Sequence, residues 1–338
     1  MTDVLTTIAS LDEGLDRGTA HPREGVALLR EAGWLGEAVE AATAAGWEVA
    51  FARLYALGAA SLTMARLYEG HLNALRLVAD CGSAAQDARV AEAAREGTML
   101  GVWGADAREP ATWNGSLLHG AKAFASGLGA VDLAIVTARR PGAEGGLQML
   151  LVDARDPARH RPEQWDVAAM VGSASGGFDC EGLAGEELGP PDAMLAEPAF
   201  HGGLWRLCAA YAGAMADIAR QSAAALAARG QGEDPRQKHR LGLIAMEARG
   251  ADLWARHAAR SVEASGDANL GVMAALQARE AIEAAALRQR ALVERALGTA
   301  LFARGSALGR RLRDLSFYLR QATLDAKLDY ATNLWRSE

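Results

Sequence analysis

Three long alanine-rich segments in the second half of the chain constrain its fold more than any other feature. They span residues 202–228, 235–264 and 270–303, and short stretches containing glycine and aspartate separate them. Helices with small side chains can approach one another closely, so these segments and a fourth at 306–320 predict a four-helix bundle. Core packing accounts for their alanine and methionine content without any role in ligand binding.

The first 97 residues also favour helices. Val26 and Leu29 are three residues apart and lie on one helix face, a spacing that recurs further along this region. Pro22 suits the first turn of a helix, and Ser83 is a good N-cap for another. The region is therefore expected to be helical throughout.

Near residue 100, glycine, threonine, valine and aromatic residues replace the alanine-rich pattern and predict a β-rich domain. Asn114-Gly115 lies between two short strand-like runs and is a strong hairpin signal, because both central positions of the tightest turns need positive φ. Residues 132–138 and 147–152 are apolar runs of strand length, whereas GSASGG at 172–177 is typical of a loop.

These residue patterns predict an α+β, mostly helical chain in three parts. An N-terminal helical domain (residues 1–97) precedes a small middle β-domain (98–190) and a C-terminal helical bundle domain (191–338). The bundle helices carry apolar or small residues on more than one face, as at 204–215. A monomer would expose too large an apolar patch, so we expect a homodimer or homotetramer.

Composition excludes several classes of protein. The 338 residues carry a net charge of -7, which gives no basic surface for nucleic acid. No run approaches the roughly 18 apolar residues of a membrane span, and the N-terminus does not resemble a signal peptide. Cys81, Cys180 and Cys208 have no C-x-x-C spacing and are expected to be buried thiols in a cytoplasmic protein. The histidines show no metal-ligand spacing, so no metal site is expected.

One segment resembles a known family. LHGAKAFASGLGAVDLAIVTAR, residues 118–139, is similar without a gap to a β-domain segment of the acyl-CoA dehydrogenase superfamily. The resemblance implies the three-part fold of that family and an FAD cofactor. It also implies that Phe124 and Ser126 contact the flavin ring. Read singly, Phe124 is equally well a strand core residue and Ser126 a turn residue.

Two further matches lie in the bundle. ALGTALFARGSALGRRLRDLSFY, residues 296–318, resembles the family's glycine-rich stretch and the arginine–aspartate pair that follows it, here Arg313-Asp314. The resemblance implies that Gly298 approaches the FAD pyrophosphate of a neighbouring subunit, and that Arg229 reaches the same cofactor. A simpler interpretation of Arg313-Asp314 is a surface ion pair.

The catalytic carboxylate of the family is missing. Removal of an α-proton from an acyl thioester needs a base, which the family usually supplies as glutamate shortly after the arginine–aspartate pair. Gln321 or Ala322 occupies that position here, and Thr323 beside them is a candidate cofactor contact. Arg206 stands at the alternative position on the first bundle helix, so the catalytic residue is unknown.

Two aspartates and one loop complete the candidate site. Asp325 and Asp329 follow the QAT segment, but exposed helix carboxylates are common. The loop after the first strand, GVWGADAREPATW, is shorter than the family's, and Gly104 lacks the hydroxyl that contacts flavin. Trp103 is therefore expected to supply part of the ring contact.

Three functions remain open from the sequence. The first is an FAD-dependent oxidoreductase of the acyl-CoA dehydrogenase type, acting on a small-molecule acyl thioester such as an acyl-CoA or on a related activated acid, with an unknown electron acceptor. The second is a flavin-dependent monooxygenase or oxidase on the same fold, which needs no α-proton base. The third is a non-catalytic scaffold relative.

Overall fold

The computed structural model describes residues 2–140, 146–320 and 324–336. The chain divides into two compact units. Residues up to 50 form the first unit together with 66–200, and residues 51–65 form the second together with the chain from 201 onward. A short stretch of the N-terminal helical region thus belongs to the C-terminal unit. The boundaries of the three-domain division stay a prediction.

The N-terminal region is helical, as the sequence predicts. Its helices are α1 (Thr2–Arg17), α2 (Pro22–Glu31), α3 (Trp34–Ala41), α4 (Trp47–Ala60), α5 (Leu62–Cys81) and α6 (Ala84–Arg95). Pro22 opens α2, and Ser83 caps α6. The Ser83 hydroxyl accepts from the Gln86 amide, and the Gln86 side chain accepts from the Ser83 amide. This reciprocal pair satisfies two amide groups that a helix start leaves without partners.

The first unit also contains two sheets. Their strands are β1 (Leu100–Trp103), β2 (Thr112–Trp113), β3 (Leu117–His119), β4 (Ala121–Lys122), β5 (Leu133–Arg139), β6 (Leu147–Asp153), β7 (His160–Arg161), β8 (Gly177–Asp179), β9 (Leu183–Ala184) and β10 (Glu186–Leu188). The larger sheet has the order β10-β6-β5-β2-β3-β9, with β1 paired in parallel to β5. The smaller sheet is β4-β8-β7. The central strands β5 and β6 are buried over their interior residues, which explains their mainly apolar sequences.

The predicted hairpin is present, but its turn differs from the expected one. β2 and β3 pair antiparallel, with Trp113 opposite Leu118. Gly115 has a φ of 99°, whereas Asn114 is not left-handed. The Asn114 side-chain oxygen accepts from the amides of Ser116 and Leu117, and this side-chain turn replaces the two-residue turn.

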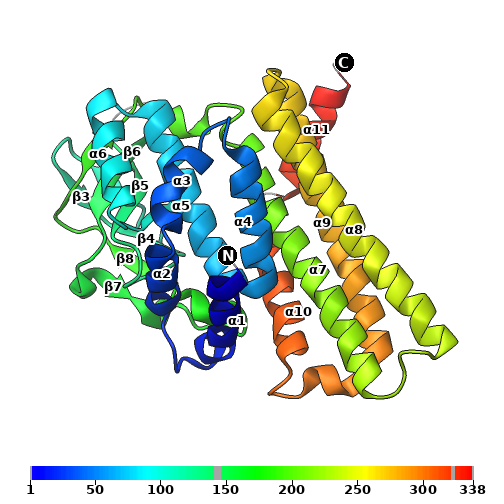
Figure 1. Cartoon of the computed structure of the whole chain (residues 1–338). Coiled ribbons are helices and arrows are strands. Elements are labelled where there is room, and N and C mark those ends of the chain that lie inside the picture. The colour runs from blue at the N-terminus through cyan, green and yellow to red at the C-terminus, as the bar shows by residue number, and fades with distance from the viewer. Residues whose placement is uncertain (1, 141–145, 321–323, 337–338) are drawn as a thin grey trace. The chain divides into compact units, whose positions relative to one another are not determined.

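The second unit holds the long helices. They are α7 (Trp205–Ala228), α8 (Pro235–Ala264), α9 (Ala268–Leu297), α10 (Ala307–Tyr318) and α11 (Leu324–Trp335). Figure 1 shows α7, α8 and α9 as long rods packed side by side. Asp234, Asp267 and Ser306 cap α8, α9 and α10 through their side-chain oxygens.

Short 3-10 turns occur in both units. They are η1 (Pro157–Arg159), η2 (Pro162–Gln164), η3 (Val171–Ser173) and η4 (Ala193–Leu195) in the first, and η5 (Gly202–Leu204) and η6 (Gly298–Phe302) in the second.

Two helix limits differ from those expected. The helix predicted over 270–303 ends at Leu297, because Gly298 adopts φ 65° and ψ -148°. That backbone conformation is accessible essentially only to glycine, and it interrupts the helical hydrogen bonds. At the other end of the bundle, α7 begins at Trp205 after the η5 turn rather than at residue 202.

Two glycines bring α4 and α7 into very close contact within the second unit. A methyl group on Gly58 would lie 2.1 Å from the carbonyl oxygen of Ala210, and one on Gly213 would lie 1.9 Å from that of Tyr55. Buried Arg311 fastens the same end of α4 by donating to the carbonyl oxygens of Gly58 and Ala60 at 2.9 and 2.7 Å. Its Nε also lies 3.0 Å from Asp217 of α7. Only glycine permits so close a crossing.

Other expectations from composition have mixed outcomes. Cys180 and Cys208 are free and buried, and burial raises their pKa values to about 11 and about 12, whereas Cys81 is only half-buried.

Met246, Leu253 and Trp254 of α8 are exposed on the isolated chain, and the homo-oligomer stays a prediction. Among the described helices, not one has the length and apolarity required to cross a bilayer.

Buried His71 links three elements of the first unit. Its Nδ1 accepts from the Leu100 amide at 3.1 Å, so its Nε2 carries the proton and donates to the Leu35 carbonyl at 3.0 Å. Burial lowers the pKa of this imidazole to about 4. The folded chain therefore holds His71 neutral near pH 7.

Gly213→Ala is expected to lower the free energy of unfolding by about 1–3 kcal/mol or more, because the new methyl group overlaps the α4 backbone. Gly242→Ala on α8 is the matched control, since nothing lies within 4 Å of its added carbon. That control is expected to gain about 0.5–1 kcal/mol from helix propensity. Thermal melts followed by circular dichroism measure both variants. Equal melting temperatures would contradict the close crossing.

His71 is also expected to make stability depend on pH. Its folded pKa of about 4 lies below the ordinary value of 6.5, so its contribution is complete above about pH 6.5 and is lost as pH falls toward 4. The loss amounts to about 3 kcal/mol. His71→Gln keeps one donor and one acceptor but does not titrate, so its unfolding free energy should vary less over this pH range. Urea titrations at pH 7.5, 5.5 and 4.5 measure the difference, and parallel profiles for the two proteins would refute the assignment.

Candidate functional site

Trp103 and Ser126, two of the predicted flavin contacts, lie together in the first unit. Trp103 ends β1 and is buried, with 2% of its surface exposed. Its indole nitrogen donates to the backbone oxygen of Ser126 at 3.1 Å. The indole ring packs 4.9 Å from Phe178, measured between ring centroids. The Trp103 indole is therefore held in one position beside Ser126 by a hydrogen bond and by packing.

Phe124 is exposed and held in an unusual backbone conformation. It follows β4, has a φ of 53°, and leaves 62% of its surface exposed, so the interpretation as a strand core residue is wrong. Left-handed backbone is rare for a bulky side chain and tends to occur at binding sites. The edge of its ring faces Trp165, with centroids 6.1 Å apart. The sequence carried no signal for Trp165.

A chain of serine hydroxyls stands behind Ser126. Ser175 Oγ donates to Ser126 Oγ at 3.1 Å, and Ser173 Oγ lies 2.8 Å from Ser175 Oγ. Ser173 also donates to the Met170 carbonyl at 2.7 Å. Each hydroxyl has one proton, and the three serines together supply the protons for these three bonds, so the network fixes the position of the half-buried Ser126 hydroxyl. The glycine and serine content of the segment containing Ser173 and Ser175 predicts only a loop.

Buried Lys122 fixes the loop that follows Trp103. Its Nζ donates to the Gly104 carbonyl at 3.0 Å, to Asp106 at 2.5 Å and to the Thr137 carbonyl at 2.8 Å. Burial lowers the pKa of this ammonium group, and the hydrogen bond to Asp106 opposes that shift. The lysine thus sets the position of the shortened loop from inside the domain.

A small hollow adjoins the same residues. It has a volume of about 10 Å³, room for about one water molecule, and Trp103, Ser126 and Arg66 are among the residues that line it. Arg66 also contacts Glu69 one turn further along α5, at 2.6 Å. No motif marked Arg66 as a site residue, because the helix that carries it lies far from the β-domain in the chain.

Arg229 and Gly298, the two cofactor contacts predicted in the bundle, lie next to each other in the second unit. Arg229 follows the end of α7, and its Nη1 donates to the carbonyl oxygen of Leu297 at 3.0 Å. That oxygen belongs to the last residue of α9, directly before Gly298. A cation at this end also offsets the negative pole of the helix dipole. The geometry gives Arg229 a structural role and brings the predicted pair together.

Arg206, at the alternative position for the base, is buried and paired. Its guanidinium group lies 3.3 Å from the Glu263 carboxylate and stacks over the Trp205 ring. The Trp205 indole nitrogen donates to the same carboxylate at 2.9 Å. Glu263 is therefore engaged by two donors and is not positioned to accept a substrate proton.

The remaining candidates contribute little to the described site. Gln321, Ala322 and Thr323 lie outside the described residues, whereas Asp325 and Asp329 are exposed on α11. Arg313 Nε contacts the adjacent Asp314 at 3.3 Å, in keeping with the simple ion pair. Within residues 2–140, 146–320 and 324–336, no three metal-binding side chains gather into a group.

Comparisons with known proteins identify the fold. No protein-family model matches the sequence, and no curated protein matches it. FMN-bound TdsC from Paenibacillus sp. A11-2 superposes with a TM-score of 0.85 and 20% identity, over 99% of this chain and 96% of that chain. KijD3 in complex with FMN and dTDP-3-amino-2,3,6-trideoxy-4-keto-3-methyl-D-glucose gives 0.83 and 18%, over 99% and 92%. Methanesulfinate monooxygenase MsuC from Pseudomonas fluorescens gives 0.83 and 17%, over 99% and 95%.

The chain has the acyl-CoA dehydrogenase-like fold. The resemblance found in the sequence is thus confirmed for the architecture: N-terminal helices, a small sheet domain and C-terminal bundle helices. Identities near 20% establish the fold alone. Fold does not determine chemistry, which depends on the residues of the site.

Proposed function

We propose that the chain is a flavin-dependent monooxygenase: bound flavin, reduced with two electrons from an external donor such as a reduced nicotinamide, would let one atom of molecular oxygen pass to a small-molecule substrate while the other leaves as water. The observation that carries this proposal is the pairing of an exposed aromatic side chain with a half-buried hydroxyl that a network of serines holds in place. These belong to Phe124 and Ser126, two residues apart in the best-matched segment. A flavin requires a ring contact and a hydrogen-bond donor from its protein.

The residues present fit a flavin. The polar edge of its ring carries both donors and acceptors of hydrogen bonds, and the Ser126 hydroxyl can serve as either. The apolar part of the flavin ring can pack against the exposed ring of Phe124. Trp103 lies beside Ser126, to whose backbone oxygen it donates. Strain at Phe124 is the kind of local cost that folds retain at binding sites. In this proposal Phe124 orients the ring and Ser126 holds its polar edge.

FMN is the proposed form of the cofactor, and FAD is the alternative. The TdsC and KijD3 structures contain FMN, whereas the resemblance in the sequence implies FAD. Ala300 and Leu301 replace the polar and glycine residues that the family places near the FAD pyrophosphate. By the same resemblance we assign Arg229 and Gly298, which adjoin each other in the bundle, to the phosphate-bearing end of a flavin bound by a neighbouring subunit.

The choice of monooxygenase over dehydrogenase rests on the missing base. Gln321 and Ala322 are uncharged, and Arg206 is a buried cation engaged with Glu263. Oxidation of an acyl thioester requires removal of an α-proton by a carboxylate, whereas a reduced flavin held at this site would supply electrons to oxygen without that base. TdsC is described as a dibenzothiophene monooxygenase, and MsuC as a methanesulfinate monooxygenase, which supports the same choice.

Ser126→Ala is expected to weaken flavin binding about five-fold, because one hydrogen bond to the ring contributes about 1 kcal/mol. Phe124→Ala should weaken it as well. Ser116→Ala, an exposed serine of the hairpin loop, is the control and should bind like the wild type. Quenching of FMN and FAD fluorescence by the purified chain measures all four proteins. Unchanged affinity in both Ser126→Ala and Phe124→Ala would show that the site is misplaced, and a chain that binds neither flavin would favour the scaffold alternative.

The flavin-loaded protein is expected to be a poor acyl-CoA dehydrogenase. Loss of a general base slows such a reaction about a hundred- to ten-thousand-fold relative to ordinary turnover of about 10 per second. Anaerobic mixing with butyryl-CoA or octanoyl-CoA should leave the flavin absorbance unchanged, whereas dithionite-reduced protein should reoxidise when oxygen is admitted. Bleaching by either thioester within a second would mean that an unrecognised base exists and that the dehydrogenase alternative is correct.

A further inference from the structure

The backbone oxygen of Met170 joins the aromatic part of the candidate flavin site to its hydroxyl part. It accepts from Trp165 Nε1 at 3.2 Å and from Ser173 Oγ at 2.7 Å. The Trp165 ring meets the Phe124 ring at an interplanar angle of 80°, with centroids 6.1 Å apart. Ser173 begins the chain of hydroxyls that ends at Ser126. The two halves of the site are thus linked through one carbonyl group.

The turn that carries this carbonyl has an unusual backbone. Met170 has a φ of 52° and Ala174 has a φ of 41°, and these two residues flank the η3 turn. Left-handed backbone is rare for residues other than glycine and persists only where surrounding contacts impose it. Met170 and Ser173 are buried, so water has little access to replace a lost hydrogen bond at this oxygen. The bonds from Trp165 and Ser173 therefore help to hold the turn in its strained form.

The backbone on both sides of Ser126 is bonded to the same segment. Three amides of residues 125–128 donate to carbonyl oxygens of residues 173–176, each at 2.9 Å: Ala125 to Gly176, Gly127 to Ser173 and Leu128 to Ala174. A change in the turn at Met170 therefore reaches Ser126 by two routes, the serine chain and these backbone bonds.

We propose that Trp165 is a positioning residue of the flavin site, which acts through the Met170 carbonyl to fix the Ser126 hydroxyl. The proposal rests on the flavin-dependent function proposed above. Without the indole donor, the turn keeps its strain but loses one of the bonds that impose it, so the Ser126 hydroxyl samples more positions. A hydroxyl that must first be ordered binds the polar edge of a flavin less tightly, because its ordering costs entropy on binding.

Trp165→Phe removes the indole donor and keeps an aromatic ring beside Phe124. FMN affinity, measured by fluorescence quenching, should fall about two- to five-fold, the upper value being the effect of one lost hydrogen bond. The visible absorbance bands of bound FMN should shift as well. Trp113→Phe is the matched control, because Trp113 is also a buried indole of the first unit and its nitrogen has no hydrogen-bond partner within the part of the chain that the structure describes. FMN affinity and spectrum should not change in that control.

A double variant distinguishes this indirect role from a direct contact between Trp165 and the flavin. If Trp165 acts through Ser126, Trp165→Phe should lose most of its effect on FMN affinity in the Ser126→Ala background. Ser173→Ala removes the other side-chain bond to the Met170 oxygen and should behave in the same way. An equal loss of affinity from Trp165→Phe in the wild-type and Ser126→Ala backgrounds overturns the proposal.

Hydrogen–deuterium exchange of the flavin-free chain tests the same coupling without a ligand. Peptides that contain residues 125–128 should exchange faster in Trp165→Phe than in the wild type, and at the wild-type rate in Trp113→Phe. Unchanged exchange in Trp165→Phe refutes the coupling, whereas FMN binding by the wild type would still support the proposed function. Faster exchange in a chain that binds no flavin would instead refute the proposed function, and with it the role of Trp165 in flavin binding.

Discussion

The close crossing of α4 and α7 is the constraint on which the C-terminal unit depends. Gly58 and Gly213 leave no room for a side chain between the two backbones, and Arg311 then donates to the carbonyl oxygens that α4 presents there. A buried guanidinium needs such partners, because an uncompensated charge in the interior is very costly. This contact explains why residues 51–65 belong with the bundle although the neighbouring sequence belongs to the first unit.

In the first unit, hydrogen bonds from the interior hold a short loop and a half-buried hydroxyl in place. Lys122 reaches the loop after Trp103 from the interior, and the serine chain orients Ser126 from behind. Both arrangements satisfy polar groups that burial would otherwise penalise. Phe124, the exposed part of the candidate site, thus stands in the chain between Lys122 and Ser126, whose side chains are both held by hydrogen bonds.

The sequence predicted well those features that depend on neighbouring residues. The long bundle helices and the Ser83 cap follow from local spacing and capping chemistry, and all are present. Less was predictable where a side chain redirects the backbone. Asn114 replaced the expected turn with its own hydrogen bonds, and Gly298 ended a helix that its composition would have continued. At the site, Trp103 and Ser126 were predicted from the resemblance, whereas Ser175 was not.

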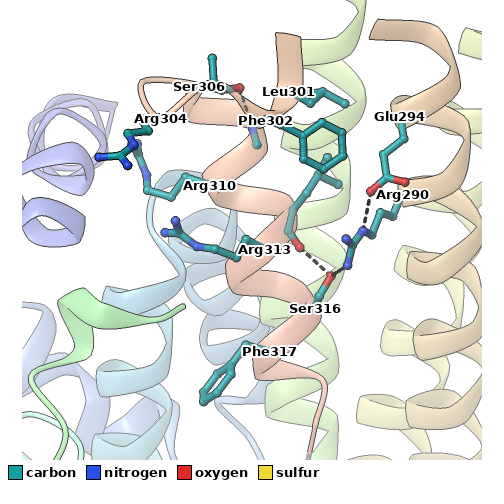
Figure 2. A pocket seen from close by; sticks show the side chains of 13 residues that line it. Arg290, Glu294, Leu301, Phe302, Arg304, Ser306, Arg310, Arg313, Ser316 and Phe317 are labelled. Carbon is teal, nitrogen blue, oxygen red and sulfur yellow. Dashed lines mark hydrogen bonds and ion pairs between the residues drawn. The ribbon is translucent and has the colours of Figure 1, made fainter. Parts of the chain in front are cut away.

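By itself the sequence determined the order of helical and β-rich regions, the caps, and the absence of a carboxylate at residues 321 and 322, since each is a property of residue identity and spacing. The tertiary structure alone decided which distant residues meet. It placed Arg229 at the end of α9, paired Arg206 with Glu263, and gathered Arg304, Arg310 and Arg313 beside one cavity of the second unit (Figure 2). Hydrogen bonds and ion pairs of this kind join residues far apart along the chain, and their geometry exists only after the helices have packed.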